Sequence, residues 1–195
     1  MRAQRPAGCL VLCFGNPARE DDGLGPAVAD YLEKLELEAV AVESDYQLRV
    51  EDALAVAESA LVVFVDAAAA GEEPFAFSRL EPRPGLDYTT HSLGPAQLLG
   101  LAEEVFGRSP ESYLLAIRGY SFDLFEEGLT ERAQVNLEAA SGFLADFLRR
   151  AAKAGAEGQG RSQRLGRSRR PSREAAELGR EAAGLGGENA EGGVG

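Results

Sequence analysis

Short apolar runs rich in valine and leucine alternate with longer segments of helical period along the first 150 residues. Strands that are buried on both faces of a parallel sheet have this apolar character, and helices connect them. The pattern therefore predicts an α/β fold: a three-layer sandwich in which a twisted, mostly parallel five-stranded sheet carries helices on both faces. The predicted strands are Cys9–Phe14, Ala39–Val42, Leu61–Val65, Phe75–Leu80 at an edge, and Tyr113–Ile117.

Four segments between and after these runs have apolar residues at helical spacing. Pro95 suits the first turn of the third helix, because an N–H at that position would have no partner within the helix. The last helix is expected to close the domain near Arg150. The predicted apolar faces are Leu24, Val28, Leu32 and Leu35 in the first helix; Leu98, Leu99, Ala102, Val105 and Phe106 in the third; and Leu137, Ala140, Leu144, Phe147 and Leu148 in the last, while Val50–Glu58 is the second helix.

The composition changes at Ala151. Of the 23 glycines, 11 lie beyond this point, no aromatic residue occurs there, and six arginines fall between Arg161 and Arg173. Such a segment cannot bury a core and is expected to be disordered. The sequence thus predicts a domain over 1–150 and a Gly/Arg-rich disordered tail over 151–195. A nucleic-acid-binding arm is the less favoured interpretation of these arginines, because no aromatic residues are interleaved with them.

Charge and hydropathy limit the partners. Residues 1–150 hold 12 Lys and Arg against 26 Asp and Glu, a net charge of −14, which disfavours nucleic acid and anionic membranes. The longest apolar run, 60–70, is interrupted by Asp66 and is shorter than the roughly 18 residues that a membrane span needs. The N-terminal apolar stretch is too short for a signal peptide. We therefore expect a cytoplasmic protein without a nucleic-acid or membrane partner.

The candidate site residues follow the predicted strands. In an open α/β sheet, ligands bind outside the carboxyl ends of the strands. Asp21 and Asp22 come after the first strand, Asp66 ends the third, and His91 precedes the third helix. A carboxylate that ends an apolar strand is partly desolvated and needs a cation or a hydrogen-bond donor. One carboxylate of the pair Asp21 and Asp22, the carboxylate of Asp66 and the imidazole of His91 together suit a borderline divalent metal with open coordination positions.

Each of these residues also has a structural interpretation. Asp66 can cap a turn or a helix, and acidic residues before a helix satisfy its free N–H groups, as Asp21 and Asp22 could do. His91 is the only histidine of the chain, and a lone histidine is more often a packed or surface residue than a ligand.

Other catalytic templates are missing from the sequence. It contains no G-x-S-x-G motif and no Walker A motif, and Gly23-Leu24-Gly25 lacks the third glycine of a dinucleotide fingerprint. Cys9 and Cys13 would share one face of a strand about 13 Å apart, too far for a disulfide, so we expect two buried core residues.

Several segments together resemble the [NiFe]-hydrogenase maturation endopeptidases. Gly15-Asn16-Pro17 followed by Asp21-Asp22-Gly23-Leu24-Gly25 is similar to the opening motif of that family, and Asp22 matches its first nickel ligand. Asp66, at the end of the third strand, matches the second ligand. His91, in Thr90-His91-Ser92-Leu93-Gly94-Pro95, matches the third. Asp45-Tyr46-Gln47-Leu48 and Ile117-Arg118-Gly119 also resemble loops of the family, so that the similarity covers roughly residues 9–142.

The resemblance implies a protease that acts once on each substrate molecule. It would remove the C-terminal extension of a [NiFe]-hydrogenase large-subunit precursor after nickel insertion, and it would recognise nickel that the substrate's own cysteines hold. Asn16 and Gln47 would contact the substrate. The catalytic group is left open, with Asp22 and Asp66 as candidates for the base. Some family members carry glutamate where Asp22 stands, and the shorter aspartate would change the geometry of the metal site. Glu20 and Asp21 therefore remain possible substitutes for Asp22 as the ligand.

Two alternatives use the same residues. A non-catalytic nickel-binding chaperone of the same fold would have the same three ligands, and the sequence does not separate it from a protease. A receiver-type phosphoacceptor domain would use Asp21, Asp22 and Asp66 for magnesium and phosphate. In receiver domains the acidic pair stands directly at the end of the first strand, whereas here it lies seven residues beyond Phe14. Arg118 also occupies the place after the last strand where receiver domains have lysine.

Overall fold

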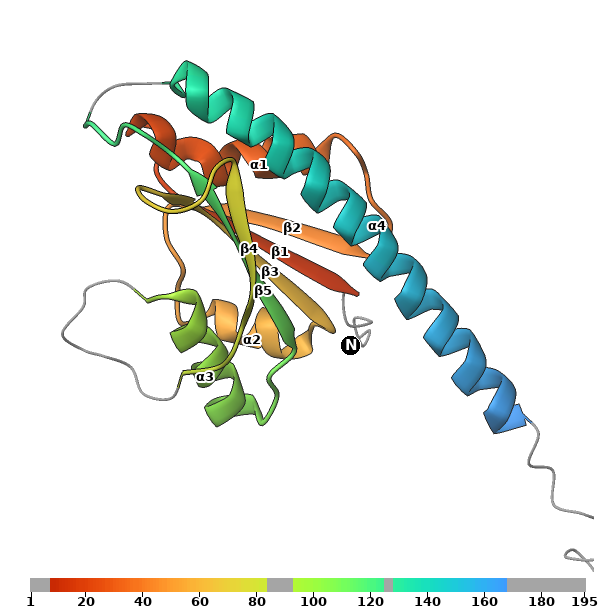
Figure 1. Cartoon of the computed structure of the whole chain (residues 1–195). Helices are drawn as coiled ribbons and strands as arrows, with labels where there is room; N and C mark the ends of the chain where they lie inside the picture. Colours follow the sequence, from red (N-terminus) through yellow and green to blue (C-terminus); the bar gives the residue numbers. More distant parts are fainter. Residues whose placement is uncertain (1–7, 84–92, 125–127, 168–195) are drawn as a thin grey trace, which may run out of the picture. The chain divides into compact units, whose positions relative to one another are not determined.

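A computed structural model of the chain describes residues 8–83, 93–124 and 128–167 (Figure 1). The chain divides into two compact units, residues 1–155 and 156–195. The first unit contains a five-stranded sheet in the order β2-β1-β3-β5-β4. All neighbouring strands are parallel except β4 and β5, which are antiparallel, so β4 is the edge strand that the sequence predicted. The strands are β1 (Cys9–Phe14), β2 (Val40–Asp45), β3 (Leu61–Ala68), β4 (Phe75–Leu80) and β5 (Glu111–Arg118).

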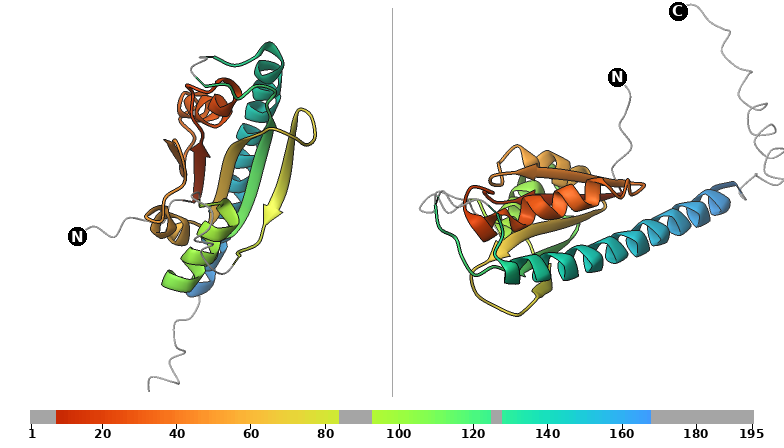
Figure 2. Two further views of the ribbon diagram at one scale, coloured as in Figure 1. Left: turned by 90° about the vertical axis from the view of Figure 1, so that its left-hand side faces the viewer. Right: turned by 90° about the horizontal axis from the view of Figure 1, so that it is seen from above.

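Helices cover both faces of the sheet, which confirms the predicted three layers (Figures 1 and 2). Alternate residues of each strand point to opposite faces, so β1 and β3 divide their apolar side chains between two cores. One core lies under α1 (Leu24–Glu33) and α4 (Glu131–Arg167), and includes Cys9, Val11 and Cys13. The other lies under α2 (Asp52–Glu58) and α3 (Pro95–Phe106), and includes Leu10 and Leu12. A short 3-10 helix, η1 (Glu20–Gly23), precedes α1.

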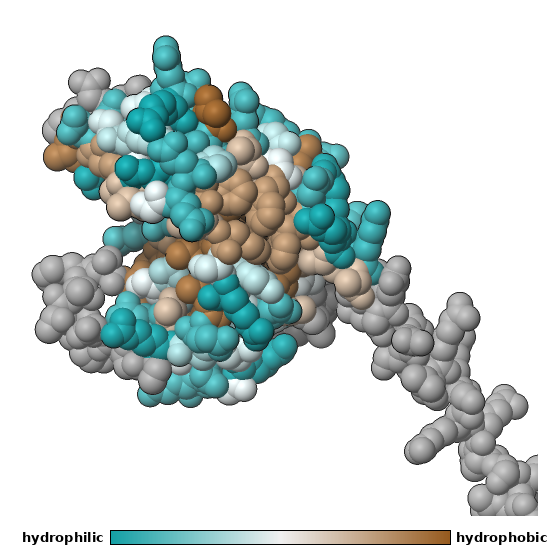
Figure 3. Space-filling model, in the orientation of Figure 1, coloured by the Kyte–Doolittle hydropathy of each residue, from teal (hydrophilic) through white to brown (hydrophobic). Residues whose placement is uncertain are grey.

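Aromatic side chains pack α4 onto the antiparallel edge of the sheet. Phe77 of β4 stacks on Tyr113 of β5 with ring centroids 4.9 Å apart, and both rings contact Phe147 of α4 edge-on. Phe75 and Phe143 extend this cluster. Apolar side chains gather on the surface over β4 and the adjoining part of α4 in Figure 3.

The structure corrects several predicted boundaries. β3 continues past Val65 to Ala68, so that Asp66 lies inside the strand and pairs with Ala116 instead of following the strand. β2 continues through polar residues to Asp45, because β1 pairs with it along its whole length. In α3, Leu98, Leu99 and Ala102 are buried as expected, but Val105 and Phe106 are 59% and 42% exposed and do not join the core beneath that helix.

The last helix does not end near Arg150. α4 continues to Arg167, so the predicted boundary is wrong. Within the described residues, no helix combines the length and apolarity that crossing a membrane requires. Both cysteines are free and buried, as predicted.

Candidate active site

The candidate site lies where the sheet changes direction. From β1 the chain passes through α1 to β2 on one side, and it later enters β3 on the other side of β1. The carboxyl ends of β1 and β3 therefore flank the topological switch point, where open α/β sheets bind their ligands. The pairing of β1 with β3 stops at Cys13 and Val65, so Asp66 is the first residue of β3 that β1 no longer covers.

Glycines turn the chain away from β1 at this point. Gly15 has a φ angle of +141°, and a Cβ atom there would overlap the carbonyl oxygen of Asp22. A Cβ on Gly25 would overlap the carbonyl oxygen of Phe14, so α1 begins directly against the end of β1. These two close approaches bring η1, and with it Asp22, back to the edge that β1 has left.

Two of the three predicted metal ligands come together here. Asp22 accepts a hydrogen bond from the backbone N–H of Asn16 at 3.0 Å, and Asp66 accepts one from the N–H of Ala67 at 2.8 Å. Burial of Asp66, with the negative charge of Asp22 nearby, raises the pKa of the Asp66 carboxyl to about 6, although its bond to Ala67 opposes the shift. Because the charge of Asp22 disfavours the ionised form of Asp66, a cation bound here would stabilise the site.

The third predicted ligand, His91, lies outside the described residues. Among the residues that the structure describes, no three His, Cys, Asp or Glu side chains form a metal-binding group. The Asp22 and Asp66 pair fits a divalent cation by its chemistry, and the ligand set of Asp22, Asp66 and His91 stays a prediction.

Asp21 is not a substitute for Asp22. Its side chain is completely buried and accepts four hydrogen bonds, from the N–H groups of Tyr120, Ser121 and Thr130 and from the Thr130 hydroxyl. These bonds outweigh the effect of burial and lower the pKa of the Asp21 carboxyl. Both oxygens are engaged, so Asp21 has no free position for a metal. The receiver-type interpretation, which needs this carboxylate, is unsupported for the same reason.

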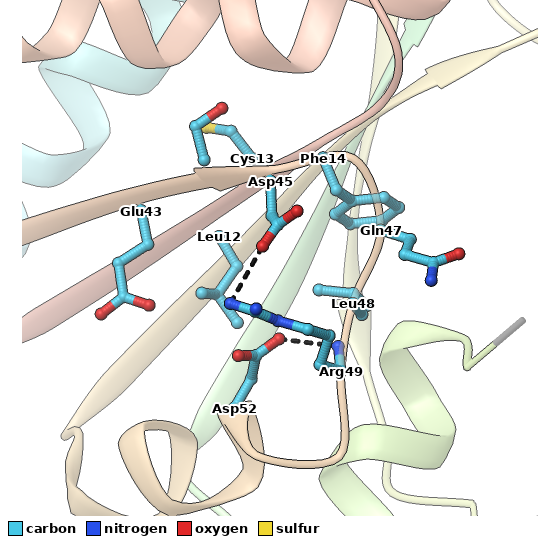
Figure 4. A pocket seen from close by; sticks show the side chains of 10 residues that line it. Leu12, Cys13, Phe14, Glu43, Asp45, Gln47, Leu48, Arg49 and Asp52 are labelled. Atoms are coloured by element: carbon cyan, nitrogen blue, oxygen red, sulfur yellow. Dashed lines mark hydrogen bonds and ion pairs between the residues drawn. The ribbon is translucent and has the colours of Figure 1, made fainter.

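The two predicted substrate contacts lie beside the pair. The Asn16 side chain accepts a hydrogen bond from the N–H of Ala18 at 2.9 Å, which shapes the loop after β1. Gln47 is exposed and lines a small pocket of about 40 Å³ next to the ends of β1 and β2 (Figure 4). Arg49 spans this pocket, and its guanidinium lies 2.9 Å from Asp45. A role of Asn16 and Gln47 in substrate binding stays a prediction.

A second hollow adjoins the first on the side of the loop after β1. Gly15, Pro17, Pro26 and Tyr46 line it, together with Ser44 and Asp45, which also line the first pocket. Figure 3 shows the surface hollowed on the side of the molecule between α1 and α3. The edge of the sheet thus has open space for a segment of another molecule.

Sequence reasoning missed the residues that hold this edge together. Thr130 joins Asp21 to the start of α4, and Asn136 of α4 donates hydrogen bonds to the carbonyl oxygen of Arg118 and to the Tyr120 hydroxyl, each at 2.8 Å. The glycine at position 119 was the one sign of this close contact in the sequence. The structure explains it, because a Cβ atom there would lie 2.9 Å from the Cβ of Asp21. The partners of a buried aspartate on other elements have no signature in a single sequence.

Comparison with known proteins places this fold and site in a class. No protein-family model and no curated protein matches the sequence. Among solved structures, the [NiFe] hydrogenase maturation protease HycI from Thermococcus kodakarensis KOD1 is 26% identical, with a TM-score of 0.58, over 73% of this chain and 93% of that one. The hydrogenase maturating endopeptidase HybD from E. coli is 21% identical, with a TM-score of 0.56, over the same shares. A hydrogenase 2 maturation peptidase from a Thaumarchaeota archaeon is 25% identical, with a TM-score of 0.53, over 72% and 97%.

This chain shares the α/β sandwich of these three structures, which are named as hydrogenase maturation proteases. The resemblance that the sequence indicated is thereby confirmed: the chain is similar to the [NiFe]-hydrogenase maturation proteases.

Proposed function

We propose that this protein is an endopeptidase that removes the C-terminal extension of a [NiFe]-hydrogenase large-subunit precursor. In this proposal nickel arrives with the substrate, held by its cysteines, and Asp22, Asp66 and His91 recognise it. Recognition of the metal restricts cleavage to precursors that have already been loaded. The acidic charge of residues 1–150 supports a basic protein partner rather than nucleic acid, and we place the reaction in the cytoplasm.

The carboxylate pair at the switch point carries the proposal. Asp22 and Asp66 lie close enough for one charge to raise the pKa of the other, which is unfavourable until a cation is present. Two protein carboxylates leave coordination positions open, so they can engage a metal that thiolates of another protein still hold. The adjoining hollows supply space for the chain that carries it.

Asp66 is the better candidate for the general base. A carboxyl group with a pKa of about 6 is ionised at neutral pH and still takes up a proton more readily than an ordinary aspartate. The substrate's nickel would supply Lewis-acid polarisation of the scissile carbonyl or of a water molecule. After the nickel has been recognised, Asp66 would accept the proton of the attacking water, while Asp22 and His91 would hold the metal.

The direct test uses a nickel-loaded precursor and mass spectrometry. We expect the wild type to release a short C-terminal peptide, and the His91→Ala and Asp66→Asn variants to leave the precursor mass unchanged. Asp146→Asn is the matched control, because Asp146 makes only an exposed ion pair with Arg149 on α4. It should process the precursor at the wild-type rate. Normal processing by Asp66→Asn would remove Asp66 from the mechanism.

The same experiment separates the protease from a nickel-binding chaperone. A chaperone would bind the loaded precursor but leave its extension intact. An unchanged mass with the wild type, with the precursor shown to contain nickel, would therefore overturn the proposed activity in favour of binding.

A further inference from the structure

Asp21 is a buried carboxylate that the proposed chemistry does not use. Its Oδ2 atom accepts hydrogen bonds from the N–H of Tyr120 at 2.7 Å, from the N–H of Ser121 at 3.1 Å and from the Thr130 hydroxyl at 2.9 Å. Its Oδ1 atom accepts a bond from the N–H of Thr130 at 2.8 Å. A side chain so completely satisfied cannot bind a ligand, so its role must be exerted through the segments that it joins.

Three elements meet at this carboxylate. Asp21 belongs to η1, Tyr120 and Ser121 follow β5, and Thr130 precedes α4. The Thr130 hydroxyl also accepts a hydrogen bond from the N–H of Ala133 at 3.3 Å, so the residue that caps α4 is the one that holds Asp21. The backbone adds a bond in the same place, from the N–H of Asp21 to the carbonyl oxygen of Ser121 at 3.1 Å.

The contact leaves little freedom for η1. A Cβ atom on Gly119 would lie 2.9 Å from the Cβ of Asp21 and 2.9 Å from the ring of Phe122, so the chain after β5 approaches η1 as closely as backbone and side chain permit. Arg19, immediately before η1, donates a hydrogen bond to the carbonyl oxygen of Phe122 at 3.2 Å. The connection between β5 and α4 therefore contacts η1, and the residue before it, at more than one position.

These contacts affect where Asp22 lies relative to Asp66. β5 pairs with β3 in parallel register, with Ala116 beside Asp66. Asp22 directly follows Asp21 in η1. The Asp21 contacts thus connect the segment that carries Asp22 to the strand beside the one that carries Asp66, without passing through either of those side chains.

We propose that Asp21 and Thr130 are positioning residues, which hold Asp22 opposite Asp66 by fixing η1 to the connection between β5 and α4. The inference rests on the proposed function for its kinetic readout. Misplacement of a reacting group by about 1 Å can cost on the order of a hundredfold in rate, so loosening η1 is expected to slow turnover.

The test compares Thr130→Val with Thr130→Ser. Valine has the shape of threonine but lacks the hydroxyl that donates to Asp21, whereas serine retains it. Cleavage of the nickel-loaded precursor is measured at a temperature at which every variant is folded. We expect kcat to fall about tenfold or more in Thr130→Val and to return to within about twofold of the wild type in Thr130→Ser.

Ser112→Ala controls for a purely structural effect. Ser112 is buried near the other end of β5, and its hydroxyl donates a hydrogen bond to the carbonyl oxygen of Pro110 at 3.0 Å. Its loss removes a buried hydrogen bond as Thr130→Val does, but far along the strand from η1. We expect its kcat to remain at the wild-type value. Equal losses in Ser112→Ala and Thr130→Val, or an unchanged kcat in Thr130→Val, would overturn the inference.

A second readout does not require activity. Two-dimensional NMR of the full chain measures the chemical shifts of the backbone amides of Asp22 and Asp66. These should change in Thr130→Val and return to the wild-type values in Thr130→Ser. If the wild type fails to cleave a loaded precursor, the proposed function fails, and these shifts still decide the positioning role. Unchanged Asp22 and Asp66 amides in Thr130→Val would refute it.

Discussion

At the scale of single residues, two adjacent aspartates have different environments. Asp21 is buried and accepts four hydrogen bonds, whereas Asp22 is partly exposed and lies near a second carboxylate, Asp66. The residue type and the position in the chain are nearly the same for both. Their surroundings decide which one holds the fold and which one remains free for a ligand.

Asp66 is expected to destabilise the fold at neutral pH. Its pKa is raised from 3.8 to about 6, so the folded state disfavours its charged form. The penalty is complete above pH 6 and disappears as the pH falls below about 4, because the carboxyl is then protonated in both states. At 1.36 kcal/mol per pKa unit the effect is at most about 3 kcal/mol.

Urea unfolding of Asp66→Asn tests this expectation. The variant should be more stable than the wild type at pH 8 and equally stable at pH 4, since an amide carries no charge at either pH. A stability difference that is the same at both pH values would show that charge is not the cause.

Asp21 should have the opposite pH dependence. Its pKa is lowered below 3.8, so its contribution to stability is present above that pH and is lost as the pH falls through the folded-state pKa. Asp21→Asn turns an amide N–H₂ toward buried donors and should cost about 2 to 4 kcal/mol at pH 7. Acid titration of both proteins by circular dichroism should show the difference shrinking below pH 4. A constant difference would contradict the assignment.

At the scale of elements, the contact between β1 and α1 requires a glycine. A Cβ atom on Gly25 would overlap the carbonyl oxygen of Phe14 and lie 3.0 Å from the Phe14 nitrogen, and backbone atoms cannot yield as a flexible side chain would. Gly25→Ala should therefore cost about 2 to 4 kcal/mol of unfolding free energy.

Gly142 provides the matched comparison for Gly25. It also lies in a helix, α4, but a Cβ atom there would meet nothing within 4 Å. Gly142→Ala should stabilise the protein by about 0.5 to 1 kcal/mol, because alanine loses less backbone entropy on folding. Thermal unfolding of the two variants should give shifts of opposite sign, and shifts of the same sign would refute the argument from close approach.

The elements show which sequence signals were sufficient. The apolar runs of β1 and β3 and the period of α1 predicted both type and place, because burial on one or both faces dictates those patterns. The ends were less predictable. β2 gained polar residues from its pairing with β1, and α4 continued to Arg167, beyond the apolar pattern that predicted it.

At the scale of the whole molecule, the residues that form the core of the first unit lie before residue 156. Among residues 131–154 of α4, whose burial the structure describes, the last fully buried apolar one is Leu148, and residues 156–195 form a separate unit. A chain that ends at Gly155 should therefore unfold within about 2 °C of the full chain, since removal of a segment outside the core removes few buried contacts. Differential scanning calorimetry checks this, and a large loss of Tm would show that the second unit supports the first.

The sequence by itself determined the layers of the sandwich and the residue types at the carboxyl ends of its strands. The reason is that apolar residues recur with the period at which a strand or helix turns its buried face to the core. Asp66 was recognisable in this way, and the resemblance to a known family singled out Asp22 beside Asp21. Only the tertiary structure decided that Asp22 lies near Asp66 while Asp21 is engaged elsewhere. That decision depends on Tyr120, Ser121 and Thr130, which are about a hundred residues away in the chain. Such long-range hydrogen bonds follow from the sheet order and the course of α4, and no local pattern encodes them.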